Sequence, residues 1–306
     1  MSVQVSVVVP TFNRADLLDA CLRALVAQTL SADQYEIIVA DDGSTDRTPA
    51  LLAAHHERSP HIRPLPLPVN RGRSAARNAA IRSAGGRVIV FVDSDVIVTP
   101  EFVFQHLQMH VHSGPRIVSR GPVVSIPAPD AIPATVPPLA ASPSLLNTAN
   151  AGVEKSALME AGLFDEGFPG YGWEDFELGQ RLAALGLRRV FSRQAVAFHV
   201  EPDPAVQEVG SALRKEEERA RSAAYFLRKR PSFETRLLIQ LTPLHRAAYW
   251  IQSGGGAIGS DNARRVVVGL QRAGLRGLAA LAFRGVLNRH YLQTLRAELK
   301  RRPEQP

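Results

Sequence analysis

Residues 88–98 read Val-Ile-Val-Phe-Val-Asp-Ser-Asp-Val-Ile-Val, and this stretch decides the fold that the sequence predicts. A β-branched apolar run of this length is typical of a strand buried on both faces, as in a parallel sheet. Open α/β sheets bind ligands just beyond the carboxyl ends of their strands. Asp93 and Asp95 follow the first five apolar residues and would share one side of an extended backbone. Such a pair suits a hard divalent cation and the phosphates it carries.

The acidic pair alone leaves other interpretations open. Aspartate is frequent in turns and helix caps, so Asp93 and Asp95 could have only a local structural role. An apolar strand that ends in Asp-x-Asp also occurs in phosphatases that form an aspartyl-phosphate, and Asp93 would then be the nucleophile. The rest of the chain has to decide between these possibilities.

Strand and helix patterns alternate on both sides of this stretch. Apolar strands are expected at residues 3–9, 35–40, 62–67, 117–121 and 195–200, with helical patterns between the early strands and after residue 174. This order predicts a parallel, doubly wound sheet with right-handed crossovers. Asn13, with Asp16 three positions later, predicts a capped start for the first helix. Seven prolines within residues 122–143 predict a long surface loop.

The chain of 306 residues is long enough for a large domain and a smaller second part. Pro202 and Pro204 mark the expected boundary, which gives an α/β domain over 1–203 and a helical region over 204–306. Residues 1–204 hold 17 Lys and Arg and 21 Asp and Glu, a net charge of −4, whereas residues 205–306 hold 19 and 8, a net charge of +11. The C-terminal region therefore favours an acidic partner, either an anionic membrane surface or nucleic acid.

Two features of the sequence indicate what the C-terminal region binds. Five arginines alternate with apolar residues, as expected for a basic amphipathic helix in a membrane interface; they are Arg264, Arg265, Arg272, Arg276 and Arg284. The same pattern fits a helical subdomain that packs on the first domain or on a second copy of the chain. Few aromatic residues lie among the arginines, so we expect no nucleic acid partner.

Cellular location is predicted from the absence of certain signals. The single cysteine, Cys21, falls among apolar helix positions, so we expect a core residue and no intrachain disulfide. No charged-then-apolar leader opens the sequence, and no run of 18 apolar residues occurs. We therefore expect a cytoplasmic protein, peripheral at the inner membrane face if the C-terminal region binds lipid.

Polar clusters follow four of the early strands, and they should meet along one sheet edge where a nucleotide would lie. No Gly-x-Gly-x-x-Gly follows the first strand, which argues against a nicotinamide dinucleotide, and no P-loop motif occurs. The clusters are Thr11, Asn13 and Arg14; Asp41, Asp42 and Ser44; Asn70, Arg71 and Arg73; and Asp93 and Asp95.

Three further residue types near the C-terminal end of this domain carry possible chemistry. Glu174 and Asp175 begin a helix, where acidic side chains interact favourably with the helix dipole and so could have only a structural role. Adjacent residues of a helix point in different directions, so at most one of the two should reach a substrate. Trp173 could present its ring to a sugar, or pack in the core. His199 lies in an apolar strand, where a buried structural histidine is the simpler interpretation.

Five short segments, taken together and in this order, resemble the motifs of a family-2 glycosyltransferase. Each lies at a predicted strand or helix end, and the resemblance covers roughly residues 3–200. The segments are Val-Val-Val-Pro-Thr-Phe-Asn-Arg at 7–14, Ile-Val-Ala-Asp-Asp-Gly-Ser-Thr at 38–45, Asn-Arg-Gly-Arg-Ser-Ala-Ala-Arg-Asn at 70–78, Phe-Val-Asp-Ser-Asp at 91–95 and Trp-Glu-Asp at 173–175.

The resemblance implies a GT-A-type fold, with a doubly wound, mostly parallel sheet flanked by helices, and a nucleotide-sugar donor. It implies that Asp42 holds the nucleobase and that Arg77 faces the donor. It also implies that Asp93 and Asp95 contact ribose and metal, and that His199 completes the metal site. The full set implied for the donor is Pro10, Thr11, Asn13, Arg14, Asp42, Arg77, Asp93, Ser94 and Asp95.

The resemblance also implies the catalytic groups and the reaction. Asp175 of the Glu174-Asp175 pair would be the general base. We assign Trp173 to the acceptor because of its aromatic ring and not because of the resemblance. Val96 stands where some relatives carry a third acid, which makes His199 more important for a metal ion. We therefore predict an inverting transfer from a nucleoside diphosphate to an acceptor hydroxyl, assisted by Mn²⁺ or Mg²⁺. The acceptor would be a glycan, a lipid-linked glycan or a small molecule.

Overall fold

The computed structural model describes residues 3–136, 144–201, 209–255, 257–258 and 262–301. Two compact units make up the chain. The first consists of Met1–Glu166 and Glu174–Glu201, and the second of Gly167–Trp173 and Pro202–Pro306. The boundary predicted at residue 203 lies outside the described residues. The sequence prediction had placed residues 167–173 in the first domain.

The first unit is built around a seven-stranded mixed sheet with the strand order β3-β2-β1-β4-β8-β6-β9. The strands β1 to β4 are parallel, β8 runs antiparallel to both of its neighbours, and β6 pairs in parallel with β9. This arrangement confirms the predicted α/β fold with a mostly parallel sheet. The bounds are β1 Val5–Thr11, β2 Tyr35–Asp41, β3 Ile62–Pro66, β4 Val88–Phe91, β6 Ile117–Arg120, β8 Ala151–Glu154 and β9 Arg188–Phe191.

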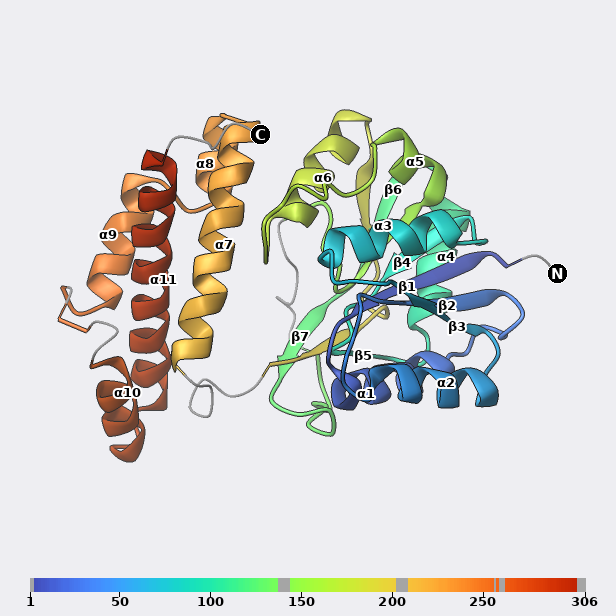
Figure 1. Cartoon of the computed structure of the whole chain (residues 1–306), viewed down its shortest axis with the longest axis horizontal. Coiled ribbons are helices and arrows are strands. Elements are labelled where there is room, and N and C mark those ends of the chain that lie inside the picture. Colours follow the sequence, from blue (N-terminus) through green and yellow to red (C-terminus); the bar gives the residue numbers. More distant parts are fainter. Residues whose placement is uncertain (1–2, 137–143, 202–208, 256, 259–261, 302–306) are drawn as a thin grey trace. The chain divides into compact units, whose positions relative to one another are not determined.

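Six helices cover the two faces of this sheet (Figure 1). Helices α1 (Ala15–Val26), α2 (Thr48–Arg58) and α4 (Phe102–Ser113) contribute to one apolar core. Helices α3 (Arg73–Ser83), α5 (Lys155–Glu160) and α6 (Glu174–Ala184) contribute to the core on the other face. Val5, Val7 and Val9 of β1 enter the first core and Val8 enters the second, so valines lie on both faces of this strand.

Residues 88–98 form two strands, one on each side of the acids. Strand β4 ends at Phe91, and the chain then leaves the large sheet and forms β5 (Val96–Val98) in a separate three-stranded sheet, β5-β10-β7. The partners there are β10 (Ala197–Val200) and β7 (Val123–Ile126). Strand β7 lies inside the proline-rich stretch predicted to be loop, and its edge position in the sheet is compatible with the flanking prolines.

The predicted cap of the first helix is wrong. Arg14 is the N-cap of α1, and its side chain makes no capping hydrogen bond. Asn13 instead has φ +50°, and its side-chain oxygen accepts hydrogen bonds from the backbone N–H groups of Thr45 (2.8 Å) and Asp46 (3.3 Å). Asn13 therefore ties the turn after β1 to the turn after β2.

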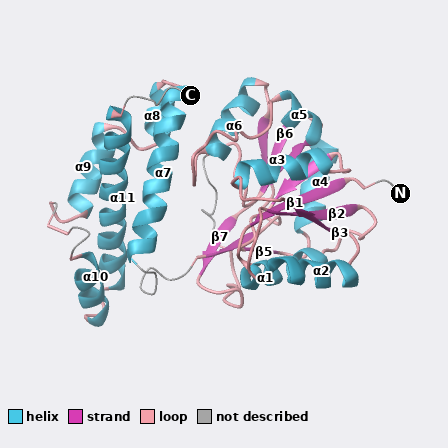
Figure 2. Cartoon of the chain, viewed as in Figure 1, coloured by secondary structure: helices cyan, strands magenta, loops and turns pink. Residues whose placement is uncertain are grey.

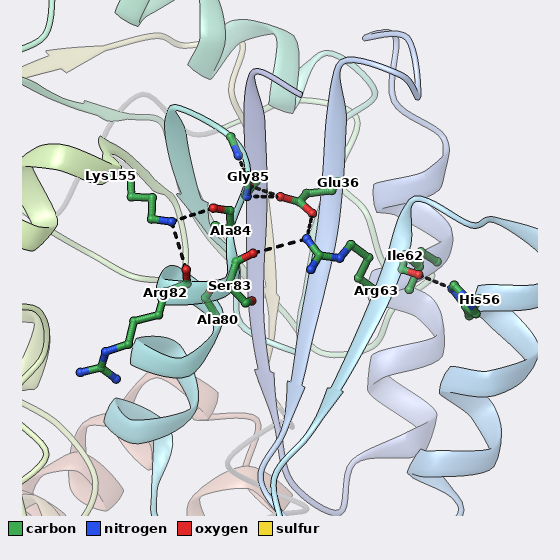
Figure 3. A network of polar contacts seen from close by, with 12 residues as sticks. Glu36, His56, Ile62, Arg63, Ala80, Arg82, Ser83, Ala84, Gly85 and Lys155 are labelled. Carbon is green, nitrogen blue, oxygen red and sulfur yellow. Dashed lines mark hydrogen bonds and ion pairs between the residues drawn. The ribbon is translucent and has the colours of Figure 1, made fainter. Parts of the chain in front are cut away.

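A polar network fixes the edge of the sheet where the parallel strands begin (Figure 3). Buried Glu36 accepts hydrogen bonds from Ser6 Oγ (2.6 Å) and the Gly85 N–H (2.7 Å), and it pairs with Arg63. Lys155 Nζ donates to the Ala84 carbonyl at 2.7 Å. These contacts link β1, β2, β3, α3 and α5 at the edge opposite the polar strand ends.

The described part of the second unit consists of helices and connecting turns (Figure 2). Helix α11 (Arg276–Lys300) packs along α7 (Val209–Lys229) and also contacts α9 (Pro243–Gln252) and α10 (Ala263–Arg272). Helix α8 (Phe233–Leu238) follows α7 and is capped by Ser232. The predicted basic helical pattern is thus divided between α10 and α11. No helix among the described residues is long and apolar enough to cross a membrane.

Candidate active site

The polar turns that follow β1, β2 and β4 contact one another at the carboxyl edge of the sheet. Asn13 N–H donates to Ser44 Oγ at 2.9 Å, which links the first two turns. Arg14 pairs with Asp95, which links the first turn to the acidic turn after β4. The predicted convergence of these clusters is therefore confirmed, because parallel strands place their carboxyl ends at one edge.

Asp42 is buried and organises the neighbouring turn after β3. Its two carboxylate oxygens accept hydrogen bonds from the backbone N–H groups of Arg71 (2.9 Å) and Gly72 (2.8 Å). Gly72 has φ +88°, a conformation that glycine adopts without steric cost, and α3 begins directly after it. Asp42 thus positions the start of the helix that carries Arg77.

Arg77 connects the two acidic motifs. Its side chain is almost fully buried, and its guanidinium donates to Asp93 Oδ1 at 2.7 Å, Glu174 Oε1 at 3.0 Å and Thr148 Oγ1 at 2.9 Å. Burial would lower the pKa of Arg77, but the charges of Asp93 and Glu174 outweigh it and raise that pKa. The guanidinium therefore stays charged and neutralises one carboxylate from each motif.

Asp95 forms a second charged cluster. Its Oδ1 lies 3.4 Å from His199 Nε2, and His199 Nδ1 lies 3.0 Å from Glu201 Oε1. Burial opposes a charge on the imidazole, but the hydrogen bonds with Asp95 and Glu201 raise the pKa of His199 to about 10. Burial also acts on Asp95, yet His199 and Arg14 lower the pKa of that carboxyl to about 2. Asp95 is therefore an ionised carboxylate that attracts cations.

Glu174 and Asp175 have different environments although they are adjacent. Glu174 is held by Arg77, as described above, whereas Asp175 Oδ1 accepts a hydrogen bond from the Phe176 N–H at 2.8 Å. Burial and the neighbouring charge of Glu174 raise the pKa of Asp175 to about 7. That at most one of the two acids reaches a substrate stays a prediction.

The remaining predicted residues are distributed as follows. Pro10 and Thr11 end β1, and Ser94 is buried in the turn between β4 and β5. Asp93 pairs with Arg77 and not with the Asp95–His199 pair. Within the described residues, no group of three or more His, Cys, Asp and Glu side chains is arranged to hold a metal ion. Trp173 is buried in the second unit, so the acceptor role given to its ring stays a prediction.

Several residues of the site were not singled out from the sequence. Thr148 contacts Arg77 from a segment without a motif, and nothing in the sequence marks it. Glu201 lies two residues beyond His199, so the alternation of a strand could have indicated it. Asn78 bonds to the backbone of Phe164 in both directions (2.9 Å each) and so fixes the segment that leads to Glu166.

Comparisons with known proteins agree with this geometry. Residues 6–135 match the family model described as Glycosyl transferase family 2. The chain is 28% identical over 297 residues to validoxylamine A glucosyltransferase of Streptomyces hygroscopicus subsp. jinggangensis, in a match that covers 85% of the chain and 66% of that relative. The chain thus spans about two thirds of the length of that protein.

Two solved structures share the fold. The mannosyltransferase PcManGT of Pyrobaculum calidifontis, in complex with GDP-Man and Mn²⁺, has a TM-score of 0.64 at 18% identity, with 98% of this chain and 87% of that chain covered. S. aureus TarS (residues 1–349) in complex with UDP-GlcNAc has a TM-score of 0.56 at 17% identity, with 96% and 91% covered. Residues 6–135 are therefore similar to the family-2 glycosyltransferases, and the two solved structures show that the fold is of the GT-A type.

Proposed function

We propose that the protein transfers a sugar from a nucleoside-diphosphate donor to an acceptor hydroxyl, with inversion at the anomeric carbon and Asp175 as the general base. One observation carries this proposal: Arg77 neutralises Glu174 and Asp93, whereas Asp175 keeps a carboxyl with a pKa of about 7. A base with a pKa near the operating pH is suited to accept a proton in the transition state.

The reaction that we propose is a single displacement. The acceptor oxygen attacks the anomeric carbon as its proton passes to an Asp175 carboxylate oxygen, and the bond between that carbon and the diphosphate oxygen breaks. Inversion follows because attack and departure take place on opposite faces of the sugar. Glu174 keeps the start of α6 in place through Arg77 and takes no proton.

The donor would lie along the carboxyl edge of the sheet. Thr11 Oγ1 is buried and has no hydrogen-bond partner within the described residues, so it is available to a nucleotide at the end of β1. Asp42 uses both oxygens in hydrogen bonds to the Arg71 and Gly72 N–H groups, and each carboxylate oxygen retains a further acceptor position for a nucleobase N–H. The GDP-Man and UDP-GlcNAc held by the two structural neighbours support a nucleotide-sugar donor.

A divalent cation fits the chemistry of the Asp95–His199 pair. If Mn²⁺ displaces the proton from His199 Nε2, the pair would offer one carboxylate oxygen and one imidazole nitrogen, a donor set that suits this ion, and Mn²⁺ is present in the mannosyltransferase complex. When bound, the ion would supply positive charge to the departing diphosphate. Arg14, which pairs with Asp95, lies at the same corner and would supply further positive charge from the chain itself.

The deciding experiment is calorimetric titration of the protein with UDP, GDP, dTDP and CMP, each with and without Mn²⁺. We expect one nucleoside diphosphate to bind, and we expect Asp95→Ala to remove the effect of Mn²⁺ on its affinity. The exposed Asp16→Ala exchange, on α1, is the matched control and should change neither quantity. Absence of binding by every nucleotide would contradict the proposal.

The phosphatase alternative has less support. Arg77 holds Asp93 Oδ1 at 2.7 Å, so a nucleophilic Asp93 would have to attack phosphorus through Oδ2. That alternative also gives no role to Asp42 or to Asp175. Release of phosphate from a generic aryl phosphate would favour it.

We further propose that the second unit contacts an anionic membrane from the cytoplasmic side, where a lipid-linked acceptor would lie. Support comes from the net charge of +11 in residues 205–306 and from large apolar side chains that are exposed on α8 and α9. Phe233 is 74% exposed, Leu244 78% and Trp250 60%. Basic and exposed apolar side chains on the same helices are the combination that binds membrane interfaces. A second copy of the chain is the alternative partner for these side chains.

A further inference from the structure

The exposed loop at residues 68–72, between β3 and α3, lies directly against the turn that carries Asp42. Asp42 accepts two backbone N–H groups of this loop, at 2.9 and 2.8 Å. A Cβ added at Gly43 would lie 3.0 Å from Asn70 N, so the next residue of the turn also touches the loop. The direction of the Asp42 carboxylate therefore depends on where this loop is held.

The side chain of Arg71 ties this loop to a distant part of the sequence. Its Nη2 atom lies 3.1 Å from Glu166 Oε2, and the two residues are 95 positions apart. The Arg71 side chain is 64% exposed and that of Glu166 is 32% exposed. Because water screens such a pair, its contribution is modest but measurable. The pair restrains the loop at a second point, in addition to Asp42.

Glu166 is itself held by the buried core of the first unit. Asn78 Nδ2 donates to Glu166 Oε1 and to the Phe164 carbonyl, and Asn78 Oδ1 accepts the Phe164 N–H, each at 2.9 Å. The buried Phe164 ring packs edge-on against Phe91 of β4, with 5.5 Å between the ring centroids. Arg82, one helical turn after Asn78, places Nη1 3.8 Å from the same carboxylate oxygen. Glu166 is thus a fixed anchor for the loop.

We infer that Glu166 is a positioning residue for the nucleobase end of the donor site: through Arg71 it keeps loop 68–72 against Asp42, whose remaining acceptor positions then face the base. This inference rests on the proposed donor site. Neither the Glu166 carboxylate nor the Arg71 guanidinium contacts the nucleotide in this arrangement. The affinity for a nucleotide would therefore depend on a side chain that lies outside the five motif segments.

The experiment is a calorimetric titration of Arg71→Met, Glu166→Ala and the double variant in the full-length protein. The ligand is the nucleoside diphosphate that binds best to the wild type, with and without Mn²⁺. All three variants keep the backbone N–H of residue 71 that Asp42 accepts, so only the side-chain contact is removed. Amide hydrogen exchange of the peptide that covers 69–74 reports on the loop, and a peptide from α4 reports on unfolding of the first unit.

Glu160→Ala is the matched control. Glu160 and Arg116 form an ion pair at 3.3 Å in the same unit, and both side chains are about half exposed. Arg116 precedes β6, which runs in the same direction as β4 because both strands are antiparallel to β8. The control pair therefore lies at the edge of the sheet opposite the polar strand ends.

We expect Arg71→Met and Glu166→Ala each to weaken nucleotide binding by about three- to fivefold. The double variant should bind as weakly as either single variant, because the same contact is removed in all three. The peptide over 69–74 should exchange at least about threefold faster with α4 unchanged, because local opening becomes easier. The factor by which Mn²⁺ raises the affinity should stay as in the wild type, since the diphosphate end of the site is untouched. Arg71→Lys should recover part of the affinity, and Glu160→Ala should behave as the wild type.

Three results would overturn the inference. One is an unchanged affinity in both single variants. Another is a loss that multiplies in the double variant, which would mean that Arg71 contacts the nucleotide itself. The third is a reduced effect of Mn²⁺ in the single variants, which would place the change at the diphosphate.

Two further outcomes are separated by the same data. Faster exchange across α4 in Glu166→Ala would indicate a general defect of the unit, and Arg71→Met, at an exposed position, then decides. If the wild-type protein binds none of the nucleotides, the proposed function has failed and this inference fails with it. If the wild type binds a nucleotide and the single variants bind it equally well, only this inference has failed.

Discussion

Arg77 gives two adjacent carboxylates different properties. Its guanidinium binds Glu174 and Asp93, so both keep a nearby positive charge, whereas no hydrogen bond from Arg77 to Asp175 is formed within the described residues. The sequence could predict that Glu174 and Asp175 would point in different directions, because this follows from helix geometry. It could not predict which of the two Arg77 would bind, since that depends on how α3 and α6 face each other across the sheet end.

The pH dependence of the reaction should report the ionisation of Asp175. A general base must be deprotonated, and burial together with Glu174 raises the pKa of Asp175 to about 7. We therefore expect kcat/KM to rise with pH and to level off above about 7. Asp175→Asn should lower kcat by about 10²- to 10⁴-fold with nucleotide affinity retained.

The control for this pH profile is Asp46→Asn, an exposed acid in the turn after β2. It should leave both the profile and the rate unchanged. A wild-type kcat/KM that does not vary between about pH 5 and 8 would show that Asp175 is not the base.

Removal of Arg77 should destabilise the first unit. Arg77→Met would leave Glu174 buried and Asp93 partly buried without a counter-charge, and we expect the free energy of unfolding to fall by about 3–5 kcal/mol. Hydrogen exchange of peptides from α3 at increasing urea concentration measures this change in the first unit, because both tryptophans, Trp173 and Trp250, belong to the second unit. Arg82→Met, at an exposed position of the same helix, should cost less than about 1 kcal/mol, and an equal loss in both variants would contradict the argument.

The acidic turn of the opening stretch is formed by a change of sheet. The apolar pattern predicted a strand that ends at the acids, as β4 does, but it did not predict the change of sheet after them: β4 pairs with β1 and β8, whereas β5 pairs with β10. The break comes at the acids, so Asp93 and Asp95 face Arg77 and His199 rather than each other. Because β4 and β5 are both buried and both need apolar residues, the apolar pattern cannot show that the chain changes sheets between them. The early parallel strands were predictable because each is a separate apolar run that ends in a polar turn.

The start of β4 provides a test at the level of secondary structure. A Cβ at Gly86 would lie 2.6 Å from the Ser6 N and Val5 C atoms of β1, so the two strands could not keep their spacing. We expect Gly86→Ala to lower the free energy of unfolding by about 1–3 kcal/mol. Denaturant titration would measure it.

The neighbouring glycine is the matched control. A Cβ at Gly85 would meet only Glu36 Oε1, at 3.4 Å, so Gly85→Ala should cost less than about 1 kcal/mol. If the two variants were equally stable, the close approach of β1 to residue 86 would not be the reason for glycine there.

The two units of the molecule differ in charge as well as in structure. The negative net charge of residues 1–204 and the positive net charge of residues 205–306 follow directly from the sequence. The helical nature of the second unit was predicted as well. The assignment of residues 167–173 to that unit was not, because it depends on ring contacts such as that of Phe168 with Tyr225, and a local pattern does not encode them.

The proposed membrane contact predicts the behaviour of the whole chain with vesicles. We expect co-sedimentation with anionic vesicles, little with neutral vesicles, and release at high salt, because the attraction is electrostatic. Leu244→Asp should weaken it, whereas Val111→Asp, at an exposed position of α4, should not. Failure to pellet with anionic vesicles at low salt would refute the membrane contact, and concentration-dependent self-association would favour a second copy as the partner.

The path of the chain between the units limits how this protein can be recombined. The chain leaves the first unit after Glu166, returns to it at Glu174 and leaves it again after Glu201. A hybrid that exchanges only residues after 201 with a relative would separate Trp173 from Arg219, which holds it. Residues 167–173 and 202–306 should therefore be inherited together, and a functional chimera needs three junctions, after residues 166, 173 and 201, rather than one.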